Sequence, residues 1–321
     1  MTWEPYIAPT PAPSPGGRGG GGGGDGRSTG RIVVAVVVAG LLLVGVGAGA
    51  VLALNLTAPS KSEYASKADA ICSPGNGSVN DIASPTNYPE LTTASSTLAD
   101  TTNEQVNLLR KLKLPSGSAG TEAKAFLASM AATGTAAQGL EDSASPKNDV
   151  ATANSARELN GAFGTASNQA KTFGFASCAV GMQSGVNSVT GGSKSIIKSS
   201  FVAKADSICR AAARKGDAIE PRNESLAEYT RAFNESVAVV TTMQSELEAL
   251  PVPPGDESQV SEMWAAQSKA IEKLKELRDA FVARNESRAT AVDLELGPLI
   301  TASDAKLDAY GLGVCGTNFG V

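Results

Sequence analysis

Two stretches of this chain are copies of each other. Residues 64–72 recur as residues 201–209, 137 positions further along, with five of nine residues identical. The same offset places residues 173–178 on residues 310–315, so the two cysteines of each copy lie 106 positions apart. A third landmark recurs within one residue of this register, as Leu114-Pro115 and Leu250-Pro251. Agreement at three points indicates one ancestral unit that was duplicated in tandem.

Each copy has the apolar spacing of helices. In the second copy, stripes with a helical period run through Leu226, Tyr229, Phe233, Val237, Val240, Leu247 and Leu250, and through Val260, Met263, Trp264, Gln267, Ile271, Leu274, Leu277 and Phe281. Ser225 and Glu228 form a capping box before the first stripe, and a similar box at Ser155 and Glu158 predicts a helix start in the first copy. The alternation typical of strands is absent. We therefore expect an all-α fold in which each copy is a bundle of about four antiparallel helices.

The four cysteines predict two disulfides. Repeat symmetry favours Cys72–Cys178 with Cys209–Cys315, which would tie the first helix of each copy to its last. Cys178–Cys209 with Cys72–Cys315 is the alternative. Closing a loop of this length stabilises a fold by roughly 4–5 kcal/mol in the chain-entropy model. Redox exchange favours Cys-x-x-Cys spacing, which the chain lacks, so we interpret the bonds as structural.

An apolar run precedes the repeats. Residues 32–54 contain no charged or polar side chain, and a helix of that length spans roughly 35 Å, enough to cross a bilayer. Arg18, Arg27 and Arg31 lie before the run, which predicts a cytoplasmic N-terminus and an extracytoplasmic C-terminal part at the plasma membrane. The alternative is a signal peptide that is cleaved near residue 50, which would give a secreted form.

The remaining N-terminal features complete the predicted organisation. Gly45 and Gly49 have the spacing that lets two membrane helices approach closely, which would allow a homodimer. The segment before the span is rich in Pro and Gly and is interpreted as disordered. We expect a cytoplasmic tail at 1–30, a transmembrane helix at 31–56, a first helical repeat at 57–182, a linker at 183–194 and a second helical repeat at 195–321.

Composition excludes several kinds of function. The chain has no His, which removes the usual general base near neutral pH and the commonest zinc ligand. Its net charge is −5 and its Lys and Arg residues form no dense stripe, so no nucleic-acid partner is expected. Carboxylate pairs such as Glu246 with Glu248, or Asp293 with Glu295, are interpreted as solvated helix faces. We expect no catalytic, cofactor-binding or metal-binding residue, and no cofactor.

Two charged residues recur in both copies. Lys67 and Asp69 in the first copy correspond to Lys204 and Asp206 in the second. Residues two apart on a helix do not face each other, so they are not a prepared acid–base pair. We interpret all four as exposed helix surface.

The copies differ in apolar content. Between their cysteines the first copy has 19 large apolar residues and the second has 28. A Pro/Gly-containing stretch at residues 73–77 also predicts a helix break after Cys72. We therefore expect the first copy to have the weaker core.

Three short motifs of the second copy resemble a known group of proteins. They are Ala-Asp-x-Ile-Cys at 205–209, Leu-Pro-x-Pro-Pro-Gly-Asp at 250–256 and Tyr-Gly-Leu-x-Val-Cys-Gly at 310–316. With the Pro/Gly-rich tail and the single span, they resemble membrane-anchored or secreted actinobacterial proteins of unknown function, over roughly residues 60–321. The resemblance implies location and fold but no activity. The first copy departs from it at residues 115–117, where the two adjacent prolines are absent.

Two classes of function remain open. The favoured one is a non-catalytic extracytoplasmic module that binds a cell-envelope protein or a small ligand between its helices, so we expect no enzyme activity. The alternative is an envelope enzyme that uses carboxylates. Such an enzyme would need a pocket with convergent acids and shifted pKa values.

Overall fold

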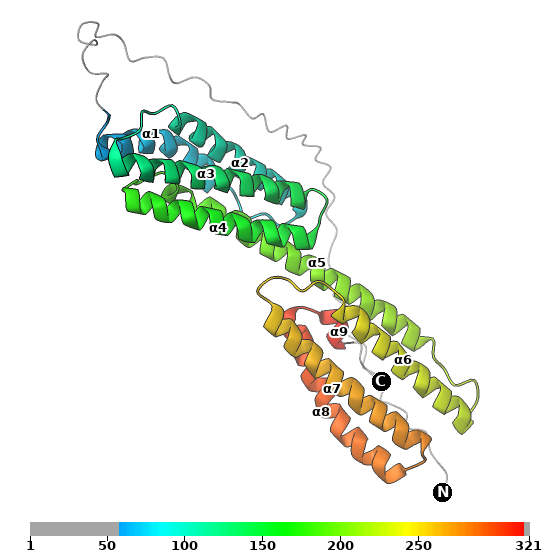
Figure 1. The fold of residues 1–321 in the computed structure, drawn as a ribbon. Coiled ribbons are helices and arrows are strands. Elements are labelled where there is room, and N and C mark those ends of the chain that lie inside the picture. Colours follow the sequence, from blue (N-terminus) through cyan, green and yellow to red (C-terminus); the bar gives the residue numbers. More distant parts are fainter. Residues whose placement is uncertain (1–57, 318–321) are drawn as a thin grey trace, which may run out of the picture. The chain divides into compact units, whose positions relative to one another are not determined.

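The computed structural model describes residues 58–317, and this part of the chain is all-α (Figure 1). It lies within one compact unit, Leu56–Val321. The predicted tail, the predicted transmembrane helix and the Gly45/Gly49 face lie outside the described residues. None of the helices in residues 58–317 combines the length and apolar character that crossing a membrane requires.

The helices form two bundles that share one long helix. The first bundle contains α1 (Lys61–Asn80), α2 (Tyr88–Leu109), α3 (Gly117–Ala144), α4 (Asp149–Phe173) and the short 3-10 helix η1 (Val180–Met182). Helix α5 (Gln183–Asp217) then continues from the first bundle into the second (Figure 1). The second bundle is completed by α6 (Leu226–Glu248), α7 (Glu257–Val282), α8 (Glu286–Tyr310) and α9 (Gly313–Thr317). By the repeat register, the second half of α5 corresponds to α1, and α6, α7 and α8 correspond to α2, α3 and α4.

The duplication extends to backbone detail. Lys147 and Arg284, which are equivalent at the 137-residue offset, have φ values of 56° and 55°. The residues that follow them, Asn148 and Asn285, both cap a helix by accepting a hydrogen bond from the third helical N–H. Helices α4 and α8 both end at a glycine in the left-handed conformation, Gly174 and Gly311. The structure thus supports a tandem copy of one helical unit.

The stretch predicted as a linker, residues 183–194, is helical and forms the beginning of α5. Two of its glycines allow close packing. A Cβ atom on Gly185 would lie 2.1 Å from the carbonyl oxygen of Val79, and one on Gly192 would lie 2.4 Å from Cδ of Pro85. Any larger residue there would push α5 away from the first bundle.

Two predicted helix boundaries in the first copy are wrong. Helix α1 does not break after Cys72 but continues through Pro74 to Asn80. Contacts from outside the helix hold this last part, because the side-chain amides of Asn76 and Asn80 donate to the carbonyl oxygens of Ser177 (2.9 Å) and Gly181 (2.7 Å). Helix α4 begins at Asp149, well before the predicted box at Ser155 and Glu158. The cap predicted at Ser225 in the second copy is confirmed.

The sizes of the two cores are the reverse of the expectation. The first bundle has one continuous core, whereas the buried apolar residues of the second bundle fall into two smaller clusters. Small residues such as Ala137 and Ala170 are completely buried in the first bundle and let its helices pack closely. In the second bundle, Leu226 and Tyr229 of the predicted stripe are 38% and 41% exposed. Counting large apolar residues was therefore a poor guide to burial.

Asp149, the first residue of α4, connects α4 to α2 and α5. Its carboxylate accepts hydrogen bonds from the Tyr88 hydroxyl of α2, the Ser200 hydroxyl of α5 (2.8 Å) and the Lys204 ammonium of α5. Burial alone would raise the pKa of Asp149, but the hydrogen bonds from Lys204, Tyr88 and Ser200 and the Lys204 charge hold it below its usual range. The ionised form therefore stabilises the attachment of α5.

Asp149→Asn is expected to lower the free energy of unfolding by about 1–2 kcal/mol near neutral pH. Because the folded pKa of Asp149 is lowered, this contribution is complete above the ordinary Asp pKa and is lost as the pH falls through the folded value. Urea titrations of the variant and the wild type should therefore differ at neutral pH and converge in acid. Asp100→Asn, at an exposed position of α2, is the control. A difference that persists unchanged in acid would contradict the assignment.

Candidate functional site

The four cysteines form two buried disulfides at equivalent places in the two bundles. Cys72 is bonded to Cys178 with a Cα–Cα distance of 5.0 Å, and Cys209 is bonded to Cys315 with a distance of 5.2 Å. This is the pairing that repeat symmetry favours. Each bond ties the first helix of a copy to the segment after its last long helix.

The repeated aspartates are not simply exposed surface, which corrects their interpretation from the sequence. Asp69 accepts hydrogen bonds from the backbone N–H groups of residues 176, 177 and 178, at 2.9, 2.7 and 3.1 Å. Asp206 accepts one from the N–H of Val314 at 3.3 Å. The aspartate three residues before the first cysteine therefore holds the segment that carries the second cysteine. The sequence signal was its recurrence in both copies.

Other shared features are also structural. The edge-to-face pair Tyr64–Phe173, with ring centroids 5.7 Å apart, has its equivalent in Phe201–Tyr310 at 5.8 Å. An ammonium group lies over the second ring of each pair, from Lys61 at 4.7 Å and from Lys198 at 4.2 Å. The repeated lysines differ: Lys67 pairs with Glu63 of its own helix, whereas Lys204 pairs with Asp149 of the first bundle.

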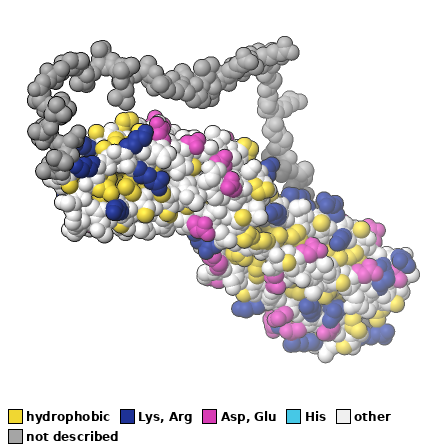
Figure 2. Space-filling view, turned by 45° about the horizontal axis from the view of Figure 1, so that its top comes forward, with side chains coloured by type: hydrophobic (Ala, Val, Ile, Leu, Met, Phe, Trp, Pro, Cys, Tyr) yellow, Lys and Arg dark blue, Asp and Glu magenta, His cyan; other side chains and the backbone are white. Residues whose placement is uncertain are grey.

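The remaining acidic candidates do not converge. Glu246 and Asp293 are exposed, Glu248 accepts a hydrogen bond from Gln244, and Glu295 pairs with Lys273 at 2.9 Å. No group of three or more His, Cys, Asp or Glu in residues 58–317 is arranged to hold a metal ion. On the face shown in Figure 2, Lys and Arg side chains lie among Asp and Glu side chains over the second bundle.

Trp264 is buried in the core of the second bundle.

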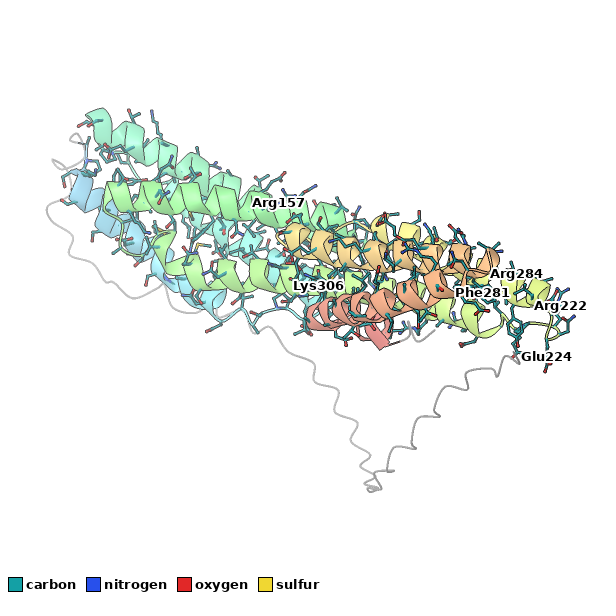
Figure 3. The ribbon with its side chains drawn as sticks, turned by 90° about the horizontal axis from the view of Figure 1, so that it is seen from below. Arg157, Arg222, Glu224, Phe281, Arg284 and Lys306 are labelled. Carbon is teal, nitrogen blue, oxygen red and sulfur yellow. A yellow bond between two sulfur atoms is a disulfide. The ribbon has the colours of Figure 1, made fainter. Side chains whose placement is uncertain are left out.

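The candidate site is a cavity on the inner sides of α7 and α8. It is lined by Gln267, Ala270, Ile271, Leu274, Leu296, Ile300, Ser303 and Asp304. The cavity has a volume of about 20 Å³. Along the two helices it lies between the level of Lys306 and the level of Phe281, which are labelled in Figure 3. Most of its wall is apolar.

The side-chain amide of Gln267 in this cavity is not satisfied by the described residues. Gln267 is 1% exposed, and both its amide oxygen and its amide nitrogen lack a hydrogen-bond partner. Such a group costs free energy unless something else pairs with it. The pKa of Asp304 is raised, first by burial and then by the charge of Asp308 one helical turn away. The cavity thus combines an apolar wall with an unpaired buried amide and a partly buried acid.

The first bundle is closed at the equivalent positions. Met130, Leu159 and Phe163, which correspond to Gln267, Leu296 and Ile300, are all buried in its continuous core. Gln267 lies within an apolar stripe of the sequence and was not predicted as a site residue. The detectable signal was the replacement of an apolar residue by an amide at equivalent positions of the two copies.

Gln267→Met, which restores the residue of the first copy, is expected to stabilise the second bundle by about 1–3 kcal/mol. The substitution removes two unpaired buried polar atoms at nearly constant volume. The measurement is the midpoint of urea unfolding followed by Trp264 fluorescence. Gln259→Met, at an exposed position of the same helix, is the control and should change little. A loss of stability in Gln267→Met would show that the amide is satisfied in the folded protein.

Comparisons with protein-family models, with curated proteins and with solved structures found no match to this chain.

Proposed function

We propose that this chain is a single-pass membrane protein that holds its duplicated helical unit outside the cytoplasm. The observation that carries this proposal is the pair of buried disulfides, because such bonds persist in oxidising compartments and are rare in the cytosol. The apolar run at residues 32–54 and the arginines before it supply the anchor and the orientation. The resemblance to membrane-anchored or secreted actinobacterial proteins agrees with this location. Dimerisation through Gly45 and Gly49 belongs to the same proposal.

The helical unit is proposed to act as a non-catalytic binding module. The cavity in the second bundle offers an apolar wall with one unpaired amide, which suits recognition of a partner or ligand. An enzyme that used carboxylates would need acids that converge from separate helices. Among the described residues, Asp304 is the only acid that lines the cavity, and its neighbour Asp308 is on the same helix. Binding is therefore the function that this site supports best.

An alkaline phosphatase domain fused after Val321 is expected to be active, because this enzyme folds only outside the cytoplasm. A matched fusion after Gly30, ahead of the apolar run, should be inactive. The active fusion should remain in the membrane fraction. Recovery of the activity from the medium would favour cleavage near residue 50, and an inactive but stable fusion after Val321 would contradict the orientation.

A further inference from the structure

The second bundle differs from the first by one helix. In the first bundle, the first half of α5 (residues 183–200) packs on α1, α2 and α4. It contributes Val186, Val189 and Ile196 to the same core as Leu159 and Phe163. In residues 58–317, α5 packs on α6 and contacts Tyr310 at the end of α8 through Phe201, and no helix other than α7 packs along both α6 and α8, which are the equivalents of α2 and α4. The cavity is lined by α7 and α8, and α8 is the equivalent of α4, which α5 covers in the first bundle.

We propose that the cavity of the second bundle is the docking site for a helix of another polypeptide, which takes the place that the first half of α5 takes in the first bundle. This inference rests on the proposed binding function and names its partner class. The partner helix would present small and β-branched residues toward α6 and α8. In residues 183–200, Gly185 lies against Val79 of α1 and Gly192 lies against Pro85, and Val186 and Val189 are completely buried.

Exposed apolar side chains on α6 support this docking surface. When α2 and α6 are aligned on their N-caps, Asn87 and Ser225, Tyr229 corresponds to Leu91. Leu91 is fully buried, whereas Tyr229 is 41% exposed, and Leu226 beside it is 38% exposed. A helix lying between α6 and α8 would cover these side chains as well as the cavity.

The polar groups of the cavity define the partner further. Gln267 needs a partner that both donates and accepts hydrogen bonds, such as a Ser, Thr or Asn side chain. Asp304 and Asp308 favour a helix with a Lys or Arg and without acidic residues. Residues 183–200 have this character, because they contain Lys194 and Lys198, several Ser, Thr and Asn residues, and no Asp or Glu.

A second copy of this chain is a poorer occupant. In a second copy, residues 183–200 are already packed in the first bundle, where Val186 and Val189 are completely buried. They could reach the cavity of another copy only by leaving that core. The observations therefore favour a separate polypeptide.

The test uses the full chain in detergent, with Trp3→Phe so that Trp264 is the only tryptophan. The probe is a synthetic peptide with the sequence of residues 183–200, and the control peptide carries Val186→Asp and Val189→Asp. Trp264 is one helical turn from Gln267, so docking should change its fluorescence in a saturable way. Asp304→Asn is expected to weaken binding by about tenfold. Tyr229→Glu, at an exposed position, should also weaken it while leaving the circular dichroism spectrum unchanged.

Three results would overturn the proposal: no binding of the probe peptide, equal binding of the control peptide, or concentration-dependent self-association that Tyr229→Glu abolishes. The last result would assign the surface to a second copy. The reporter fusions measure membrane topology independently, so failure of helix docking and failure of the proposed location are distinguishable.

Discussion

Replacing Cys209 and Cys315 with alanine is expected to lower the melting temperature of the second bundle by about 15 °C. The bond closes a chain separation of 106 residues, for which loop-closure entropy gives about 4–5 kcal/mol. The second bundle has little to offset this loss, because its core consists of two small clusters beside an open cavity. Trp264 fluorescence in the fragment Leu56–Val321 reports this transition, since Trp264 is its only tryptophan.

The matched variant replaces Cys72 and Cys178 with alanine. It removes a bond of the same chain separation, so the entropic effect should be similar. The first bundle has a continuous core, however, and should remain folded at temperatures where the Cys209/Cys315 variant has lost its second bundle. If the Cys72/Cys178 variant is the less heat-stable of the two, the difference in core size does not govern stability.

Phe126→Ala is expected to cost the first bundle about 3–5 kcal/mol. Phe126 is completely buried and packs against Phe175 with ring centroids 4.6 Å apart, so the substitution leaves a cavity in the core. Far-ultraviolet circular dichroism during heating measures the effect. Tyr229→Ala, on the exposed side of α6, should change stability by less than about 1 kcal/mol. Comparable losses in the two variants would contradict the assigned burial.

The sequence predicted features that depend on local patterns or on the repeat. The all-α class follows from apolar periodicity, the disulfide pairing follows from the equivalence of the two cysteine pairs, and the α6 cap follows from Ser225 and Glu228. The errors arose where contacts between distant segments decide the local structure. Pro74 does not end α1, because the amides of Asn76 and Asn80 donate to the carbonyl oxygens of Ser177 and Gly181, on either side of Cys178. Residues 183–194 were predicted as a linker but are helical, and Gly185 and Gly192 let α5 pack closely against Val79 and Pro85.

The core and the candidate site were harder to predict for a similar reason. Composition records how many large apolar residues a copy has, not whether a helix is present to cover them. The first copy buries its smaller set because the first half of α5 closes its bundle. The second copy leaves Tyr229 exposed and Gln267 without a partner. The Gln267 amide within its apolar stripe indicates the candidate site only when Gln267 is compared with its equivalent in the first copy, Met130.

Hydrogen exchange measured by mass spectrometry on the intact chain tests the central claim, that the second bundle is an open version of the first. The comparison is between the equivalent segments 159–167 of α4 and 296–304 of α8, which line the closed core and the cavity. Backbone amides of the α8 segment are predicted to exchange at least about tenfold faster than those of the α4 segment, because less packing opposes local opening. Equal or slower exchange in the α8 segment would contradict the claim.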